Sequence, residues 1–174
     1  MSVCFHKENP IHIRDERPGD VQAIHTLTQA AFANAPHAGG NEAQIVDTLR
    51  HTGALTLSLL AEEEGLIVGH VAFSPVTIPD VEGWFGLGPI SVLPDRQRQG
   101  IGSALIGEGL SRLRQCGASG CLLLGDPAYY SRFGFTSDPR LTYLGYQTPN
   151  LQRLVLNGQP PVGAVVYHAA FDSS

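Results

Sequence analysis

The fold is decided by residues 91–105, which read SVLPDRQRQGIGSAL. The stretch begins as an apolar strand, passes through a turn with glycines at 100 and 102, and continues as a helix with apolar residues at 101 and 105. The first N–H groups of a helix have no partner within it, and the helix dipole adds positive potential there. Glycine lets a ligand approach the backbone without interference from a Cβ atom. The stretch therefore predicts an anion site that fits two linked phosphates.

Other phosphate-binding motifs do not fit this stretch. A P-loop requires a lysine after its last glycine, but Ser103 follows Gly102. A dinucleotide-binding fingerprint requires a third glycine where this sequence has Leu105. Arg96 and Arg98 flank the turn, and each is either an additional phosphate ligand or an ordinary solvated residue. The sequence leaves both interpretations of the two arginines open.

Outside this stretch, the apolar pattern predicts an α/β fold with a mixed sheet. Gly86, Gly88 and Pro89 lie inside a predicted strand and indicate a kink in it. No repeat or long linker interrupts the pattern, so we expect one domain over residues 1–174. The expected strands are 11–14, 56–61, 66–76, 84–93, 121–124, 141–146 and 164–171, and the expected helices are 18–32, 42–50, 101–117 and 127–132.

Composition and charge exclude several classes of function. The 174 residues are 43% hydrophobic, which suits one buried core. Sixteen acidic side chains against 11 basic ones give a net charge of −5, which disfavours nucleic acid or anionic lipid as a partner. No apolar run approaches the roughly 20 residues that span a membrane, and Met1 to Pro10 lacks the apolar core of a secretory signal, so we expect a cytoplasmic protein. Neither the seven histidines nor the three cysteines have metal-ligand spacing, so we expect no metal and cysteines that are buried or idle.

Two ordered motifs resemble those of a known superfamily. Gln97, Gly100 and Gly102 form a Gln-x-x-Gly-x-Gly pattern that is similar to the acetyl-CoA motif of the GNAT superfamily of acyltransferases. Residues 130–135, YSRFGF, resemble its later Tyr-x-x-x-Gly-Phe motif, and residues 125–135 and 166–171 look like its bacterial YhbS-type branch. The resemblance covers nearly the whole chain. It implies a mixed, mostly antiparallel sheet with a splayed central strand pair flanked by helices.

The resemblance also implies a function and a set of cofactor contacts. It implies an N-acetyltransferase that moves an acetyl group directly from acetyl-CoA to a primary amine of a small molecule or peptide. The backbone N–H of Ile90 is expected to face the thioester oxygen, and Val92 is expected to bond the pantetheine amides. The pyrophosphate is expected to rest on main-chain N–H groups of Gln97, Arg98, Gly100, Gly102 and Ser103.

Tyr130 matches the position of the superfamily's tyrosine acid. A phenol with an ordinary pKa of about 10 stays protonated at neutral pH and can donate to a departing thiolate. Tyr129 is expected to be a packed aromatic, and simple packing is also the alternative for Tyr130. Some relatives carry a glutamate base on the fourth strand, where this sequence has Gly86. Glu42 and Asp126 are candidates for the base, although each also suits a helix-terminal or solvated role.

Two other functions stay open at this stage. A CoA-binding module without turnover is one, because the fourth-strand carboxylate is missing. An acyltransferase for a different acyl chain or acceptor is the other, because a pyrophosphate site does not sense what the thiol carries. The sequence also leaves open the identity of the acceptor and whether the chain forms a homodimer.

Overall fold

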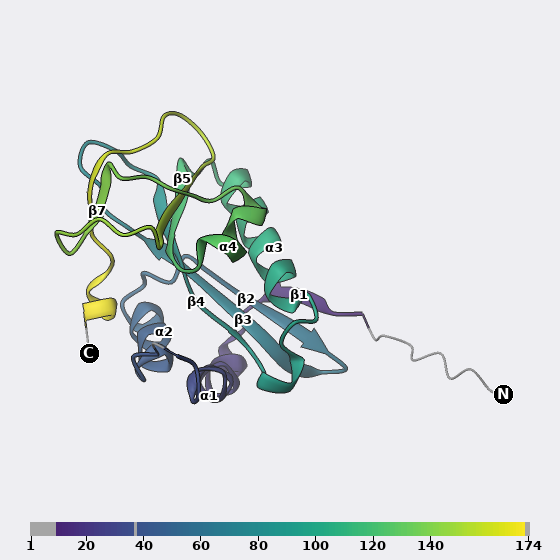
Figure 1. The fold of residues 1–174 in the computed structure, drawn as a ribbon. Coiled ribbons are helices and arrows are strands. Elements are labelled where there is room, and N and C mark those ends of the chain that lie inside the picture. Colours follow the sequence, from purple (N-terminus) through teal and green to yellow (C-terminus); the bar gives the residue numbers. More distant parts are fainter. Residues whose placement is uncertain (1–9, 37, 173–174) are drawn as a thin grey trace.

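A computed structural model describes residues 10–36 and 38–172 of the chain (Figure 1). Within these residues, a seven-stranded sheet has the order β1-β2-β3-β4-β5-β8-β6, and a separate two-stranded sheet pairs β7 with β9. The strands are β1 (His12–Asp15), β2 (Leu57–Glu63), β3 (Leu66–Pro75), β4 (Trp84–Val92), β5 (Gly120–Leu124), β6 (Thr136–Ser137), β7 (Leu141–Tyr143), β8 (Leu151–Val155) and β9 (Gly163–Val165). The α-helices are α1 (Val21–Phe32), α2 (Glu42–His51), α3 (Ile101–Gln115) and α4 (Pro127–Tyr130), and 3-10 helices span Pro18–Asp20, Pro94–Arg96, Ser131–Phe133 and Ala169–Asp172.

Helices cover both faces of the large sheet. Successive side chains of β3 point to opposite faces, and both sets are buried by helices. Val71 and Phe73 pack with α3 in the main core, whereas Ala72 points to the opposite face and packs with Ile24 of α1. A Cβ atom at Gly109 of α3 would lie 2.3 Å from the Phe73 ring, so the absence of a side chain there lets the helix approach β3 closely. In Figure 1, α1 and α2 lie together below the sheet, on the opposite side from α3.

The central strands β4 and β5 separate after a short contact. They pair in parallel from Trp84 to Gly86 on β4, opposite Gly120–Leu122. Beyond Gly86, β4 continues along β3, while β5 continues along β8 as far as Leu124. The register of β4 on β3 shifts opposite Gly88 and Pro89, where the sequence predicts a kink. The predicted splayed strand pair is therefore confirmed, and the two strands enclose a V whose point is at Gly86.

The C-terminal third differs most from the sequence prediction. Strand β8 was not expected, because Gln152 and Arg153 interrupt its apolar pattern, although Gln152 is fully buried between β5 and β6. The strand expected at 164–171 ends at Val165, and residues 169–172 form a 3-10 helix that lies beside α2 (Figure 1). The strand expected at 141–146 ends at Tyr143, since the chain turns there. Short apolar runs fit either structure, so tertiary contacts decide between them.

The two cysteines within the described residues differ in exposure. Cys121 is fully buried on β5, where burial raises the pKa of its thiol above the ordinary range, so this thiol is inert as expected. Cys116 lies exposed just after α3 and is not buried. Cys4 lies outside the described residues.

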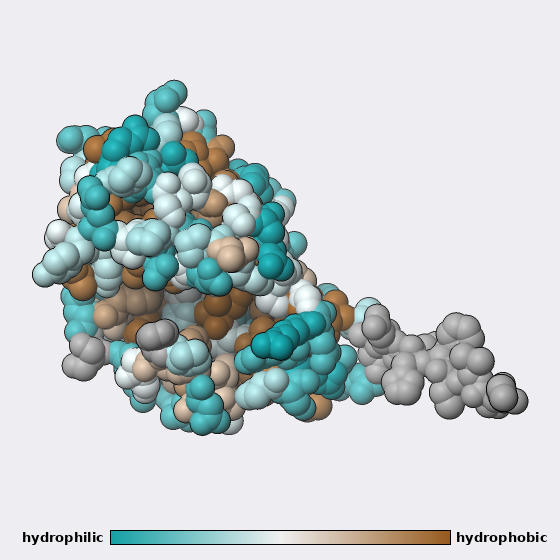
Figure 2. Space-filling model, viewed as in Figure 1, coloured by the Kyte–Doolittle hydropathy of each residue, from teal (hydrophilic) through white to brown (hydrophobic). Residues whose placement is uncertain are grey.

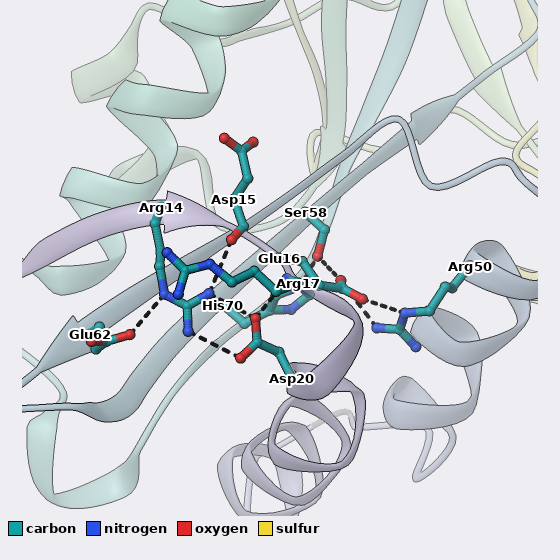
Figure 3. A network of polar contacts seen from close by, with 9 residues as sticks. All are labelled: Arg14, Asp15, Glu16, Arg17, Asp20, Arg50, Ser58, Glu62 and His70. Carbon is teal, nitrogen blue, oxygen red and sulfur yellow. Dashed lines mark hydrogen bonds and ion pairs between the residues drawn. The ribbon is translucent and has the colours of Figure 1, made fainter.

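A partly buried polar network joins the segment before α1 to the sheet (Figure 3). The Glu16 carboxylate accepts a 2.5 Å bond from Arg50 Nε of α2 and another from the hydroxyl of Ser58 on β2. The same hydroxyl lies 2.8 Å from Nε2 of His70 on β3. Burial lowers the pKa of His70 to about 4, so its imidazole is neutral at physiological pH. The network therefore ties the corner between β1 and α1 to three other elements.

This burial predicts a specific pH dependence of stability. The folded protein binds a proton at His70 less readily than the unfolded chain, whose histidine pKa is about 6.5. We therefore expect His70 to lower the free energy of unfolding by about 1.4 kcal/mol per pH unit as the pH falls from 6.5 to 4, roughly 3 kcal/mol in all. Urea melts of wild type and His70→Gln over this range measure the effect. The free energy of unfolding of His70→Gln should fall less steeply with decreasing pH than that of wild type. Parallel plots of unfolding free energy against pH for the two proteins would contradict the prediction.

Candidate active site

The edge of β4 that faces the V carries main-chain groups that are not paired with β3. The N–H of Leu93 donates to the carbonyl of Val68 on β3 at 3.0 Å. Main-chain groups alternate in direction along an antiparallel strand, so Ser91 also faces β3, whereas Ile90 and Val92 face the V. The side chain of Gln97 supports this, because its Nε2 reaches the carbonyl of Val92 at 3.3 Å. Ile90 and Val92 therefore present donors and acceptors to whatever lies between β4 and β5.

The turn after β4 exposes a second set of donors. Gly100 precedes α3 with a φ of +84°, a left-handed conformation that favours glycine. The helix then begins at Ile101, and its first hydrogen bond runs from the N–H of Ala104 to the carbonyl of Gly100. The N–H groups of Ile101, Gly102 and Ser103 precede this bond and have no partner within the helix. Together with the helix dipole, they provide the free donors that the predicted anion site requires.

A cavity of about 460 Å³ lies over this turn. Six of the seven predicted cofactor residues line it, and the seventh, Ile90, places its Cδ1 4.0 Å from the Cβ position of Gly102. The structure therefore brings all seven together at one end of the V. The lining residues are Val92, Arg96, Gln97, Arg98, Gly100, Ile101, Gly102, Ser103, Tyr129 and Arg132.

Sequence reasoning missed two residues of this cavity. Tyr129 was expected to be only a packed aromatic, but its Oη lies 3.3 Å from Oγ of Ser103. The guanidinium of Arg132 lies 4.3 Å above the Tyr129 ring, and its Nε donates to the Tyr129 carbonyl at 2.8 Å. The pair holds a positive charge beside the anion site. The sequence signal for this pair was the spacing of three residues between Tyr129 and Arg132, which places both side chains on the same side of a short helix. Arg96 also lines the cavity, but it forms a 2.6 Å ion pair with Glu63.

Tyr130 lies next to this wall, on the β5 arm of the V. Its ring contacts Tyr129 edge-on, with a centroid distance of 4.9 Å, and also packs near Phe135. A Cβ atom at Gly125 would lie 2.5 Å from the ring, so the chain passes closely beneath it. Burial raises the pKa of Tyr130 to about 12. The hydroxyl is therefore a stable hydrogen-bond donor throughout the physiological pH range.

The positions considered for a base carry no free carboxylate inside the V. A Cβ atom at Gly86 would lie 2.8 Å from Cε1 of Tyr167, whose ring fills the space that a glutamate there would need. Glu42 accepts the N–H of Gly39 at 2.6 Å at the start of α2. Asp126 caps α4 by accepting the N–H of Ala128 at 2.9 Å. Both carboxylates therefore have the helix-terminal roles that were their alternative interpretation.

Membrane-spanning helices and metal sites are the two remaining features that the sequence analysis considered. No helix within residues 10–36 and 38–172 is long and apolar enough to span a membrane. In the same part of the chain, no group of three or more histidine, cysteine, aspartate or glutamate side chains is arranged to hold a metal ion.

The open V and the anion site beside it together define an acyltransferase of the acyl-CoA-dependent type. Residues 55–137 match the family model described as "Acetyltransferase (GNAT) domain". The chain is 39% identical over 173 residues to an Escherichia coli K12 protein described as "Uncharacterized N-acetyltransferase YhbS", with 92% of this chain and 98% of the relative covered. The chain therefore belongs to the GNAT family of acetyltransferases.

Solved structures agree with this assignment. A GNAT family acetyltransferase from Brucella melitensis, crystallised in complex with acetyl-CoA, is 51% identical and has a TM-score of 0.83 over 95% of this chain and 100% of its own. The structure of Escherichia coli YhbS in complex with CoA is 33% identical and has a TM-score of 0.84, covering 94% of this chain and 93% of its own. Both structures match nearly the whole chain with high TM-scores, so the predicted fold class is confirmed.

Proposed function

We propose that this chain is an acetyl-CoA-dependent N-acetyltransferase that transfers the acetyl group directly to a primary amine of a small molecule or peptide. The observation that carries the proposal is the V whose open end meets the anion site at α3. The pyrophosphate rests on the N–H groups of residues 97–103, and the pantetheine arm lies along Val92 and Ile90. The two relatives crystallised with acetyl-CoA or CoA support this arrangement.

The chemistry requires three contributions from the protein. The neutral amine attacks the thioester carbon, and the N–H of Ile90 stabilises the negative charge that develops on the thioester oxygen. The C–S bond then breaks, and the Tyr130 hydroxyl donates a hydrogen bond to the departing sulfur. Because the pKa of Tyr130 is about 12, the phenol stabilises the thiolate mainly by hydrogen bonding. The amine nitrogen releases a proton to solvent, the CoA thiolate takes up a proton from solvent, and the products are the acetylated amine and free CoA.

We also propose where the reaction takes place and which partners it excludes. Residues 1–174 act as one catalytic domain in the cytoplasm, without nucleic acid or membrane as a partner, in keeping with the net charge of −5. Size-exclusion chromatography with light scattering tells a monomer from a homodimer.

The direct test is acetyl-CoA turnover with a panel of primary amines, followed by thiol release and by mass spectrometry of the products. We expect amine-dependent release of CoA together with a product heavier by one acetyl group. Failure of acetyl-CoA and CoA to bind in calorimetry would contradict the proposal.

A second candidate is a CoA-binding module without turnover, which the occupied space over Gly86 favours. Binding of CoA without any product across the amine panel would support this candidate. An acyltransferase with a different acyl preference is the remaining alternative. Competition binding between acetyl-CoA and longer acyl-CoA molecules distinguishes it from the N-acetyltransferase and from the binding module.

A further inference from the structure

Two buried hydroxyl groups flank the point of the V. Gly86 is the last residue of β4 that pairs with β5, and the anion site lies beyond the other end of the V, past Val92. A cofactor arm that starts at the anion site and runs into the V therefore directs its reactive end toward Gly86. The groups around Gly86 are the ones that an incoming acceptor meets, so this inference rests on the proposed function.

The first hydroxyl belongs to Tyr167, in the segment between β9 and the last 3-10 helix. Its Cε1 lies 2.8 Å from the Cβ position of Gly86, so the ring lies directly on the β4 backbone. The ring packs against Tyr143 and Phe171 at centroid distances of 5.4 and 5.2 Å. Val166 anchors the segment by exchanging hydrogen bonds of 2.9 and 2.8 Å with Thr77. The position of the ring is therefore held from several sides.

The second hydroxyl belongs to Ser74 of β3. Ser74 and Gly86 are directly opposite each other in the antiparallel pair of β3 and β4, so their Cβ directions point to the same face of the sheet. Ser74 is fully buried. The hydroxyls of Ser74 and Tyr167 therefore lie on the same side of Gly86, opposite the face that α3 covers.

Neither hydroxyl has a hydrogen-bond partner among the described residues, and both oxygens are closed off from solvent. An unpaired buried hydroxyl costs stability, and the large majority of buried polar atoms in folded proteins are paired. Two such groups around one glycine, at the point of the V, indicate a place where a polar ligand completes the hydrogen bonding. Figure 2 shows the surface hollowed above α1 and α2, in the region that β4 crosses in Figure 1, with apolar residues gathered in the hollow.

We propose that Ser74 and Tyr167 bind the attacking nitrogen of the acceptor, with each hydroxyl oxygen accepting one N–H bond of a primary amine. The lone pair of the nitrogen is then left to face the thioester carbon. Burial raises the pKa of Tyr167 far above its ordinary value, so this residue orients the amine and does not deprotonate it. The site takes the unprotonated amine, which loses its water shell on entry. Tyr167 thus fills the space that a glutamate at position 86 of β4 would occupy, but it orients the amine and does not act as a base.

The test compares Tyr167→Phe and Ser74→Ala with wild type, using the primary amine that wild type acetylates. We expect the acceptor KM to rise about tenfold in each variant, as for the loss of one hydrogen bond, while the affinity for acetyl-CoA stays within about twofold. Thermal stability should stay the same or increase, because each change removes an unpaired buried hydroxyl. A residue that only supports the fold would not combine lost activity with retained stability. Tyr143→Phe, which changes the neighbouring ring, should keep wild-type kinetics.

Unchanged acceptor KM and kcat in both variants would overturn this proposal alone. So would a loss of activity that is matched by an equal loss of acetyl-CoA affinity or by a lower Tm. A wild-type protein that binds CoA but acetylates no amine would overturn the proposed function, and the acceptor site with it.

Discussion

Gly102→Glu is expected to abolish the binding of acetyl-CoA. The Cβ position of Gly102 faces the cavity, 3.5 Å from Oη of Tyr129 and 3.9 Å from Cγ2 of Val92. A glutamate there fills the space above the first turn of α3 and places a negative charge where the diphosphate binds. Like charges brought together in an interface cost several kcal/mol, so affinity in calorimetry should fall by more than about 100-fold.

The matched control is Gly102→Ala, whose Cβ meets only ordinary van der Waals distances. This variant should keep most of its affinity, and alanine should stabilise the helix by about 0.5 to 1 kcal/mol relative to glycine. Glutamate in the first turn of a helix is also favoured by the helix dipole, so Gly102→Glu should remain folded. A folded Gly102→Glu protein that binds acetyl-CoA with wild-type affinity would contradict the proposed pyrophosphate site.

Tyr130→Phe is expected to lower kcat by about 10- to 100-fold, as for the loss of a hydrogen bond to a charged group, without weakening acetyl-CoA binding. The phenylalanine ring keeps the packing against Tyr129 and over Gly125, so stability should change little. Because the pKa of Tyr130 is about 12, its ionisation should produce no fall in wild-type activity below about pH 11. Steady-state kinetics from pH 6 to 10 measure both effects.

The neighbouring tyrosine provides the comparison for this experiment. Tyr129→Phe removes the hydroxyl that lies 3.3 Å from Ser103 in the wall of the cofactor cavity. We expect this variant to bind acetyl-CoA more weakly but to retain kcat at saturating cofactor. Full kcat in Tyr130→Phe throughout the pH range would remove Tyr130 from the mechanism.

The geometry of the proposed cofactor end of the site was largely predictable because it is local in sequence. The turn with left-handed Gly100 and the N–H groups of Ile101, Gly102 and Ser103 that follow it are neighbours in the chain. The kink at Gly88 and Pro89 was equally predictable, since both residues disturb a strand wherever they occur. By contrast, Tyr129 and Arg132 were not predicted in the cavity, because only packing of α4 on the rest of the molecule brings them to Ser103.

The sequence by itself determined the order of the main elements, the free N–H groups at the start of α3 and the family to which the chain belongs. Short-range backbone geometry and the spacing of glycines carry this information, and neither depends on distant contacts. Only the tertiary structure decided that Leu151–Val155 is a strand and that Tyr167 lies on Gly86 beside Ser74. These residues are far apart in the chain, and burial against distant partners overrides their local pattern. The proposed acceptor end of the active site is therefore a property of the folded chain.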